Sequence, residues 1–220
     1  AKSRYVVGIS HELRSPLNAI AGYAQLMRKD PAIPAHRRDA VKVIQHSADH
    51  LAGLIEGLLD ISKIEAGHLT IYRERFNLHE FLAQTVDMFR LQTDAKELRF
   101  LFEPAENLPV FVFGDEKRLR QVLINLLSNA RDASPPGGAI RVRSEASEHT
   151  VDLIVEDEGS GIPKAIIDRL FEPFFTTKDK GSGLGLYSVK KILSSMNGWI
   201  GLSSEVGQGT CVKLYLPVVG

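Results

Sequence analysis

Two runs of apolar residues with coiled-coil spacing limit what the first part of this chain can fold into. The first run takes one step of seven residues and then alternating steps of four and three through Val6, Leu13, Leu17, Ile20, Ala24 and Met27. The second takes alternating steps of three and four residues through Val41, Ile44, Ala48, Leu51, Ile55, Leu58 and the polar Ser62. Pro31 and Pro34 separate the runs, and proline cannot continue a helix. The pattern therefore predicts two antiparallel helices joined by a tight turn.

Such a hairpin is too small to form a stable core alone. A single pair of helices buries little apolar surface, so we expect two copies of the chain to pair as a four-helix bundle. The heptad spacing stops near Glu65, and residues 69–76 alternate in the manner of a strand. We therefore place a boundary at about residues 66–72, between a helical domain at 1–66 and a second domain at 73–220.

The second domain mixes the periodicities of helices and strands. Its predicted helices cover residues 78–95, 116–134, 163–170 and 184–196. Its predicted strands lie near residues 98–103, 110–113, 139–146, 149–157, 199–204 and 210–216. This order of elements predicts an α+β sandwich, in which helices pack on a mixed sheet.

Composition narrows the class of protein. Lysine plus arginine and aspartate plus glutamate number 27 each, so no surplus charge favours nucleic acid, a membrane surface or an acidic polymer as partner. The single cysteine, Cys211, excludes an internal disulfide and fits a small strand residue in a reducing compartment. No apolar run approaches the length of a membrane helix. We expect a cytoplasmic fragment of a longer protein, with a sensor domain and any membrane anchor upstream of Ala1.

The first candidate site is the segment Ser10–Leu17, which reads Ser-His-Glu-Leu-Arg-Ser-Pro-Leu. His11 stands two positions before the seam residue Leu13, so its side chain is expected on the outer, solvent-facing side of the helix. Pro16 cannot donate a hydrogen bond to the Glu12 carbonyl, so the helix should bend within a turn of His11. The segment predicts an accessible imidazole nucleophile beside a movable element. For a lone His-Glu pair, a surface histidine with a chance proline is the favoured explanation.

The second candidate is a pair of asparagines late in a predicted helix. Asn125 and Asn129 are four residues apart and therefore share a helix face. Asparagine is a poor helix former, so two on one face call for a reason beyond a polar surface. Their amide oxygens are ligands that Mg2+ accepts together with water and phosphate oxygens.

Two glycine-rich segments complete the set. Asp157 ends a predicted strand before Gly159 and Gly161, where a carboxylate can accept a hydrogen bond from an adenine amine, although any tight turn has the same pattern. The run Gly181-Ser-Gly-Leu-Gly precedes a helix, whose N-terminus attracts phosphate. It lacks the Gly-Lys-Ser or Gly-Lys-Thr of a Walker loop. Lys178, just upstream, is a candidate phosphate partner.

Taken in this order, these segments resemble those of the two-component sensor histidine kinases across essentially the whole chain. The similar segments are the histidine box at Ser10–Leu17, the asparagine box at Asn125–Ala130, the glycine boxes at Asp157–Gly161 and Gly181–Leu186, the phenylalanine box at Phe171–Phe175 and the closing motif at Gly207–Thr210. The resemblance implies a Bergerat ATP-binding fold. It also implies a homodimer that phosphorylates its own His11 from ATP and then an aspartate on a response regulator.

The resemblance further implies a set of nucleotide-binding residues. Adenine is expected against Asp157, Mg2+ on Asn129 with Asn125 in support, and the triphosphate under the loop from Thr176 to Gly185. The full set is Asn125, Asn129, Asp132, Asp157, Gly159, Gly161, Thr177, Lys178, Gly181, Gly183, Leu184, Gly185 and Thr210.

Beside the acceptor His11, the resemblance gives catalytic roles to Glu12 and Ser15. Glu12 is expected to accept a proton from the other imidazole nitrogen or to orient it. Ser15 lies four residues after His11 on the same helix face, where relatives usually carry threonine or asparagine to hold an attacking water. A serine hydroxyl is less firmly aimed than that of threonine, so we expect only weak phosphatase activity toward the regulator.

Three other functions fit parts of the pattern. ATPases of the same superfamily open the asparagine box with a glutamate that activates water, whereas Asn125 cannot act as a general base. A serine kinase of the anti-sigma type leaves His11 unexplained, and a dimeric scaffold with a degenerate pocket conflicts with the intact segments. Two departures from the family stand out. Asp132 replaces a lysine found in many relatives, which shifts phosphate contacts to Lys178 or Arg131, and the lid is short.

Overall fold

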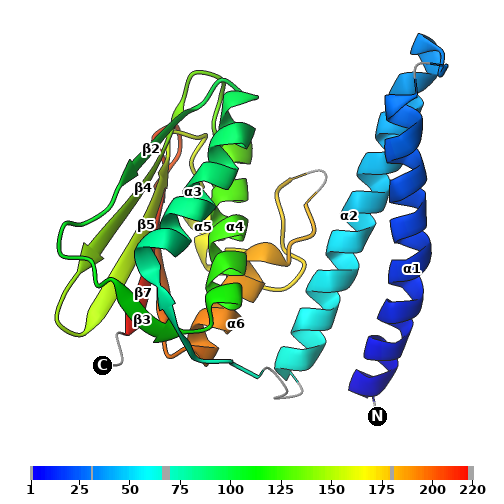
Figure 1. The fold of residues 1–220 in the computed structure, drawn as a ribbon. Coiled ribbons are helices and arrows are strands. Elements are labelled where there is room, and N and C mark those ends of the chain that lie inside the picture. The colour runs from blue at the N-terminus through cyan, green and yellow to red at the C-terminus, as the bar shows by residue number, and fades with distance from the viewer. Residues whose placement is uncertain (1, 31, 66–69, 179–180, 218–220) are drawn as a thin grey trace. The chain divides into compact units, whose positions relative to one another are not determined.

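The computed structural model describes residues 2–30, 32–65, 70–178 and 181–217, with only part of the side chains in the N-terminal helices. The chain forms two compact units. One comprises Ala1–Leu69 with Pro173–Leu184, and the other comprises Thr70–Glu172 with Gly185–Gly220. Figure 1 shows the elements of both units. The domain boundary expected at about residues 66–72 stays a prediction, because part of that range lies outside the described residues.

The first unit contains two long helices, α1 (Lys2–Lys29) and α2 (Ala35–Glu65), which run antiparallel and side by side (Figure 1). Between them, the Asp30 side chain accepts a hydrogen bond from the Ala32 amide at 2.8 Å. The prediction of two helices joined by a tight turn is confirmed. In the described part of the chain, no helix is long and apolar enough to span a membrane.

The heptad seam of the hairpin has a buried half and an exposed half. The buried half is 2–8% exposed and consists of Leu17, Ala24, Val41, Ala48 and Ile55. The other half is 40–48% exposed and consists of Leu13, Ile20, Met27, Ile44, Leu51 and Leu58. The Val6 side chain lies outside the described residues. One hairpin therefore covers only half of its apolar stripe.

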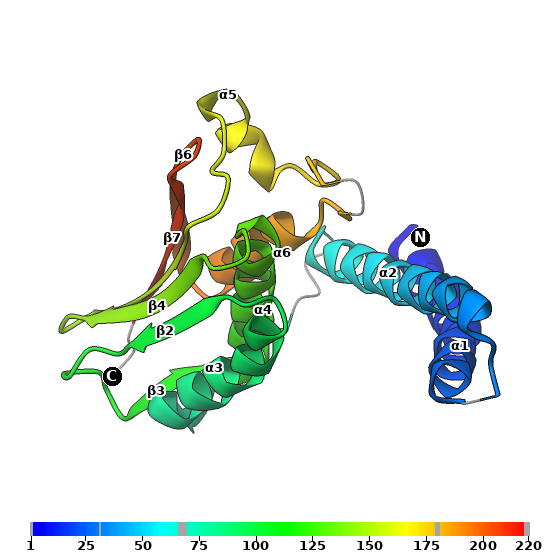
Figure 2. The same ribbon diagram turned by 90° about the horizontal axis from the view of Figure 1, so that it is seen from above.

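The second unit has a five-stranded sheet covered on one face by three helices (Figure 2), with a small two-stranded sheet beside it. Its strands are β1 (Glu74–Asn77), β2 (Arg99–Glu103), β3 (Phe111–Gly114), β4 (Ala139–Ala146), β5 (Thr150–Asp157), β6 (Trp199–Glu205) and β7 (Gly209–Pro217). The covering helices are α3 (Leu78–Asp94), α4 (Glu116–Ala133) and α6 (Gly185–Ser195). The strand order in the large sheet is β2-β4-β5-β7-β6, where β2 and β4 are parallel and the other neighbours antiparallel. The predicted α+β sandwich is confirmed.

The core of this unit lies between α4 and the covered face of the sheet. α4 contributes a stripe at three- and four-residue steps: Leu119, Val122, Leu123, Leu126, Leu127 and Ala130. The sheet contributes alternate residues of its central strands: Ile140, Val142, Leu153, Val155 and Leu214. This packing turns the face of α4 that carries Asn125 and Asn129 away from the middle of the core.

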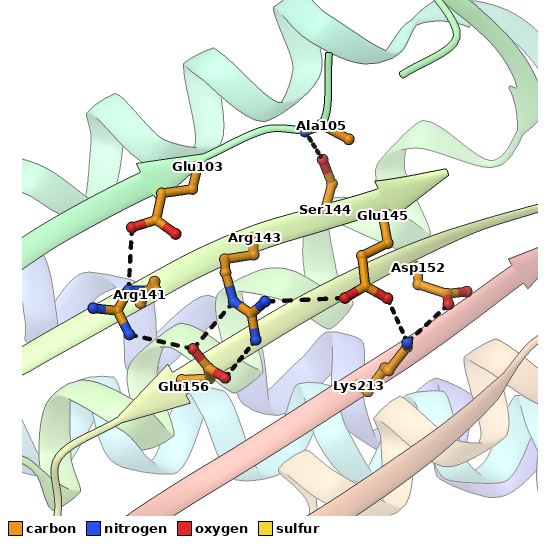
Figure 3. Close-up of polar contacts among 9 residues, drawn as sticks. All are labelled: Glu103, Ala105, Arg141, Arg143, Ser144, Glu145, Asp152, Glu156 and Lys213. Atoms are coloured by element: carbon orange, nitrogen blue, oxygen red, sulfur yellow. Dashed lines mark hydrogen bonds and ion pairs between the residues drawn. The ribbon is translucent and has the colours of Figure 1, made fainter. Parts of the chain in front are cut away.

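The other face of the sheet carries a ladder of ion pairs that crosses four strands (Figure 3). Arg141 pairs with Glu103 at 3.2 Å and with Glu156 at 3.7 Å, and Arg143 pairs with Glu156 at 2.7 Å. At the far end, Lys213 contacts Glu145 at 2.7 Å and Asp152 at 3.0 Å. The hydrogen bond from Arg143 holds the pKa of the Glu156 carboxyl below its usual value. Alternation along the strands separates this polar face from the core.

Two expectations about single elements were wrong in detail. The strand expected at residues 69–76 covers only Glu74–Asn77 among the described residues, because β3 offers four residues for pairing and the Tyr72 amide donates to the Asp115 side chain instead. The single helix expected at 163–170 is a short α5 (Lys164–Ile167) followed by a 3-10 turn, η1 (Asp168–Phe171). Pro173 disfavours the α conformation in the residue before it, which limits the length of this element.

Candidate functional site

One face of α4 carries the two asparagines that the sequence singles out. Asn125, Asn129 and Ala133 follow at four-residue steps and therefore share this face. At one end of it, a Cβ placed on Gly185 would lie 3.8 Å from Asn125 Oδ1. At the other end, a Cβ on Gly159 would lie 2.9 Å from the Ala133 side chain and carbonyl oxygen. Residues of both glycine-rich segments thus border the same helix face.

Asp157 ends β5, and the loop that follows orients its carboxylate. The Gly159 amide donates a hydrogen bond to Asp157 Oδ1 at 2.9 Å. A Cβ on Gly159 would lie 2.5 Å from the same oxygen, so a side chain there does not fit. The Ser160 amide donates to the Ala133 carbonyl at 3.4 Å. The loop therefore holds the Asp157 carboxylate beside the last turn of α4.

Gly161 and Thr210 lie at the same end of the sheet. Gly161 has a φ of +67°, and a Cβ on it would overlap the Glu205 carbonyl oxygen. Thr210 stands opposite Asp157 in the register of β5 and β7, and its hydroxyl lies 3.0 Å from Ser204 Oγ. The first glycine segment is thus held against the connection between β6 and β7.

The backbone of the segment Pro173–Leu184 requires glycine at position 183. Gly183 has a φ of +67°, and a Cβ on it would overlap the backbone of Phe174. Phe174 itself has a φ of +65°, which a bulky side chain rarely adopts. Two residues of this segment are therefore held in left-handed conformations at a point of close backbone approach. Such strain is a feature of ligand-binding loops.

The same segment contains the other phosphate candidates. The Lys178 amide donates to Thr176 Oγ1 at 3.1 Å, and a Cβ on Gly181 would overlap that oxygen. The side chains of Thr177 and Lys178 are exposed, whereas Leu184 is buried. Residues 179 and 180 lie outside the described part of the chain.

The residues expected to act in catalysis lie in α1. The backbones of His11 and Glu12 are part of this helix, and their side chains lie outside what the structure describes. Ser15 is exposed on α1, next to the exposed Pro16. The expected roles of His11, Glu12 and Ser15 therefore stay predictions.

The C-terminal end of α4 is strongly hydrogen-bonded. Arg131 donates to Asp132 Oδ1 at 2.9 Å through Nη2 and to Gln92 Oε1 at 2.5 Å through Nη1. The Lys96 ammonium donates to the carbonyl oxygens of Arg131 at 2.6 Å and Ser134 at 2.8 Å. A cation at this end of a helix interacts favourably with the helix dipole. Arg131 is therefore held at this end of α4 by neighbouring polar groups.

The donor set fits magnesium better than a metal that prefers histidine or cysteine. In the part of the chain that the structure describes, no group of three His, Cys, Asp or Glu side chains could hold a metal ion. The amide oxygens of Asn125 and Asn129 are hard donors, and Mg2+ completes its coordination with water and phosphate oxygens.

Sequence reasoning missed two charged residues that organise α4. Asp115 is the N-cap of α4, with its side chain accepting a hydrogen bond from the Arg118 amide at 3.0 Å. An aspartate directly before a helix is a recognised start signal and could have been noticed. Lys96 lies 35 residues from its nearest carbonyl partner, Arg131, so no local pattern could have found it.

Comparisons with known proteins assign both parts of the chain. Residues 1–67 match the family described as the His Kinase A (phospho-acceptor) domain. Residues 114–220 match the family described as histidine kinase-, DNA gyrase B- and HSP90-like ATPase. A curated relative, the autoinducer 2 sensor kinase/phosphatase LuxQ of Vibrio parahaemolyticus, is 34% identical over 99% of this chain and 27% of its own length. The chain spans about a quarter to two fifths of the length of the curated relatives it matches first.

Solved structures agree in fold along the whole chain. Full-length ShkA in complex with AMPPNP has a TM-score of 0.83 and 27% identity, covering 99% of this chain and 46% of that chain. Histidine kinase ThkA in complex with the response regulator protein TrrA has a TM-score of 0.71 and 27% identity, covering 98% and 61%. The N-terminal helices match a phospho-acceptor family, and the α/β unit matches an ATPase-type family. The curated relatives that cover nearly every residue are sensor kinases as well. The chain belongs to the two-component sensor histidine kinases.

Proposed function

We propose that this chain binds ATP, transfers the γ-phosphate to His11 and then passes it to an aspartate of a response regulator. The observation that carries the proposal is the gathering of Asp157, Gly159 and Gly185 around the asparagine face of α4, in a chain whose N-terminal part belongs to a phospho-acceptor family. ShkA was solved with AMPPNP and ThkA with a response regulator, which supports a nucleotide and a regulator as partners here.

The nucleotide would be held by groups of different chemistry along this face. The Asp157 carboxylate, oriented by the Gly159 amide, accepts a hydrogen bond from the adenine amine. Asn129, supported by Asn125, would hold Mg2+, and such an ion would supply positive charge beside the phosphates. Lys178 and the amides at the start of α6 attract the phosphates. The remaining members of the set are Asp132, Gly161, Thr177, Gly181, Gly183, Leu184, Gly185 and Thr210.

Phosphoryl transfer then depends mainly on the position of His11. An imidazole nitrogen of His11 attacks the γ-phosphorus in line, the bond to the bridging oxygen breaks, and ADP leaves. Glu12 takes the proton of the other nitrogen or orients it. In the second step, a carboxylate oxygen of the regulator attacks the phosphorus and the phosphorus–nitrogen bond breaks. Asn125 cannot act as a general base, which disfavours hydrolysis of ATP.

A homodimer is part of the proposal. The exposed half of the seam, which includes Leu13, Ile20 and Ile44, is an apolar stripe that a second hairpin would cover in a four-helix bundle. Ser15 is exposed on α1, where its hydroxyl can hold a water for weak phosphatase activity toward the regulator. The cytoplasmic location and the upstream sensor domain stay predictions.

Labelling with γ-labelled ATP tests the proposal. We expect the chain to gain a label that survives base and is lost in acid, as a phosphoramidate should, and His11→Gln to gain none. His36→Gln, which changes an exposed histidine at the start of α2, is the matched control and should label normally. A label that persists in His11→Gln would contradict the proposal.

A further inference from the structure

Asp115 is buried at a distance from the nucleotide residues. It lies between the end of β3 and the start of α4, and it is 6% exposed. In the part of the chain whose burial the structure describes, it is the only buried residue with an ionisable acidic or basic side chain besides Tyr187. A buried carboxylate is costly unless hydrogen bonds satisfy it, so its partners show what it does.

The two carboxylate oxygens of Asp115 bind two different segments. Oδ1 accepts a hydrogen bond from the Arg118 amide at 3.0 Å, which caps the first turn of α4. Oδ2 accepts a hydrogen bond from the Tyr72 amide at 3.1 Å, 43 residues away in the sequence. Tyr72 belongs to the segment that connects the end of α2 at Glu65 with β1. One side chain therefore joins this connecting segment to α4.

Further contacts hold the connecting segment at the same place. The Tyr72 side chain is 69% exposed, so the backbone amide rather than the ring makes the attachment. Ile71 and Arg73, on either side of Tyr72, line an apolar cavity of about 50 Å³ together with Phe76 and Asp115. β1 then pairs with β3, with Glu74 opposite Gly114. Because Asp115 itself is buried, hydrogen bonds to its carboxylate are stronger than they would be at a fully exposed position.

α4 connects Asp115 to the nucleotide residues as a rigid element. Asn125 and Asn129 lie 10 and 14 residues further along, or about 15 and about 21 Å at about 1.5 Å per residue. The apolar side of α4 is buried along its length, from Leu119 to Ala130. One packed helix therefore joins the residue that holds Tyr72 to the two asparagines.

We propose that Asp115 is a positioning residue for phosphoryl transfer: it locks Tyr72 to the start of α4 and so fixes the point at which the connection to the acceptor helices leaves the α/β unit. The proposal rests on the function proposed above. Asp115 does not contact the nucleotide in this account. Its loss should therefore slow transfer without weakening the binding of ATP.

Asp115→Asn separates the two bonds. Asparagine is an equally good N-cap, but its side chain has a single acceptor oxygen, so the bond to Arg118 can stay while an NH2 group faces the Tyr72 amide. We expect kcat for autophosphorylation to fall about 10- to 100-fold, as misplacement of reacting groups does. The KM for ATP should stay within about twofold of the parent, and so should the affinity for an ATP analogue measured directly. Both should be unchanged because Asp115 does not contribute to the binding of ATP in the ground state.

Tyr72→Pro removes the other half of the same bond, because proline has no amide hydrogen. Tyr72→Ala keeps that hydrogen and is the matched control. We expect Tyr72→Pro to lower kcat as Asp115→Asn does and Tyr72→Ala to leave it unchanged. The double variant Asp115→Asn with Tyr72→Pro should be no slower than either single variant, since both remove one interaction. Asn77→Ala removes the N-cap of α3, whose side chain accepts a hydrogen bond from the Glu80 amide, and should lower stability without changing kcat.

The test is the rate of autophosphorylation of the full 220-residue chain and of each variant. Circular dichroism checks that each variant is folded. If Asp115→Asn and Tyr72→Pro both transfer phosphate at the parental rate, Asp115 has only a structural role. A KM for ATP that rises as kcat falls, or losses that add in the double variant, would also overturn the proposal. If the parent chain itself gains no label on His11, the proposed function is wrong. That result is distinct from a failure of the Asp115 proposal, in which the parent chain is labelled and the variants are labelled equally fast. Should Asp115→Asn not fold, Tyr72→Pro against Tyr72→Ala carries the test alone.

Discussion

In the helical hairpin, buried seam residues alternate with seam residues that are 40–48% exposed, whereas the apolar stripe of α4 is buried throughout at 0–2% exposed. Both stripes follow the spacing of an amphipathic helix. The difference is in what covers them. The five-stranded sheet, α3 and α6 together cover the apolar stripe of α4 within one chain, while one hairpin covers only half of its own seam. The stability of the α/β unit is therefore expected to be a property of a single chain, whereas we propose that the stability of the hairpin depends on a second copy.

Ile44→Lys should have the largest effect, because it places a charge on the exposed half of the seam. In a homodimer two copies of the side chain are lost from the interface, at about 1.5–3 kcal/mol for each. We expect the dimer to dissociate at micromolar concentration, as measured by light scattering. Val43→Lys, at a position 64% exposed and outside the seam, is the control and should remain dimeric. A parent chain that is monomeric at micromolar concentration would break the comparison outright.

Leu123→Ala should lower the free energy of unfolding of the α/β unit by about 2–5 kcal/mol, since it empties part of a closed core. Leu123 is 1% exposed, whereas Leu91, which is 77% exposed, provides a control at which alanine should cost little. The midpoint of thermal unfolding of this unit should not depend on protein concentration. A midpoint that rises with concentration would show that the α/β unit also depends on a second copy.

Gly183→Ala should weaken ATP binding about 10-fold, because the left-handed conformation costs alanine about 1–2 kcal/mol and its Cβ would overlap the Phe174 backbone. Calorimetric titration with a non-hydrolysable ATP analogue measures the change. Gly137→Ala is the control: φ is +81° there, but nothing lies within 4 Å of the added Cβ. It should lose a similar amount of stability with no loss of affinity. Equal losses of affinity in both variants would argue for a different pocket.

The smallest expected effect is the response of the ion-pair ladder to acid. The pKa of Glu156 is lowered by its hydrogen bond from Arg143, and that of Glu145 by its hydrogen bond from Lys213. Carboxyls with a lowered pKa in the folded state stabilise the fold above their unfolded pKa of about 4.3 and lose that contribution as the pH falls below it. Denaturant unfolding between pH 6 and pH 3 should show a decline, with less of it in Glu156→Gln. The effect is small because the pairs are partly exposed.

The sequence predicted most elements because their patterns are local. The heptads of α1 and α2, the apolar run of α4 and the alternation along β4 and β5 each depend on nearby residues. The segment before β1 was predicted wrongly because its hydrogen bond goes to Asp115, 43 residues away. Site residues were found through short segments that contain their own signal, such as Asp157 with Gly159. Lys96 was missed because its partners at the end of α4 come from a distant part of the chain.

The central claim is that the hairpin supplies the phosphate acceptor and the α/β unit supplies the ATP. Mapping the phosphate by tandem mass spectrometry, after reaction of the full chain with ATP at alkaline pH, tests this claim most directly. We expect one modified residue, His11, in the peptide that spans Ser10–Leu17, with a yield that falls in Gly183→Ala. Phosphate on Ser10, on Ser15 or on another histidine, or release of inorganic phosphate with no modified peptide, would contradict it.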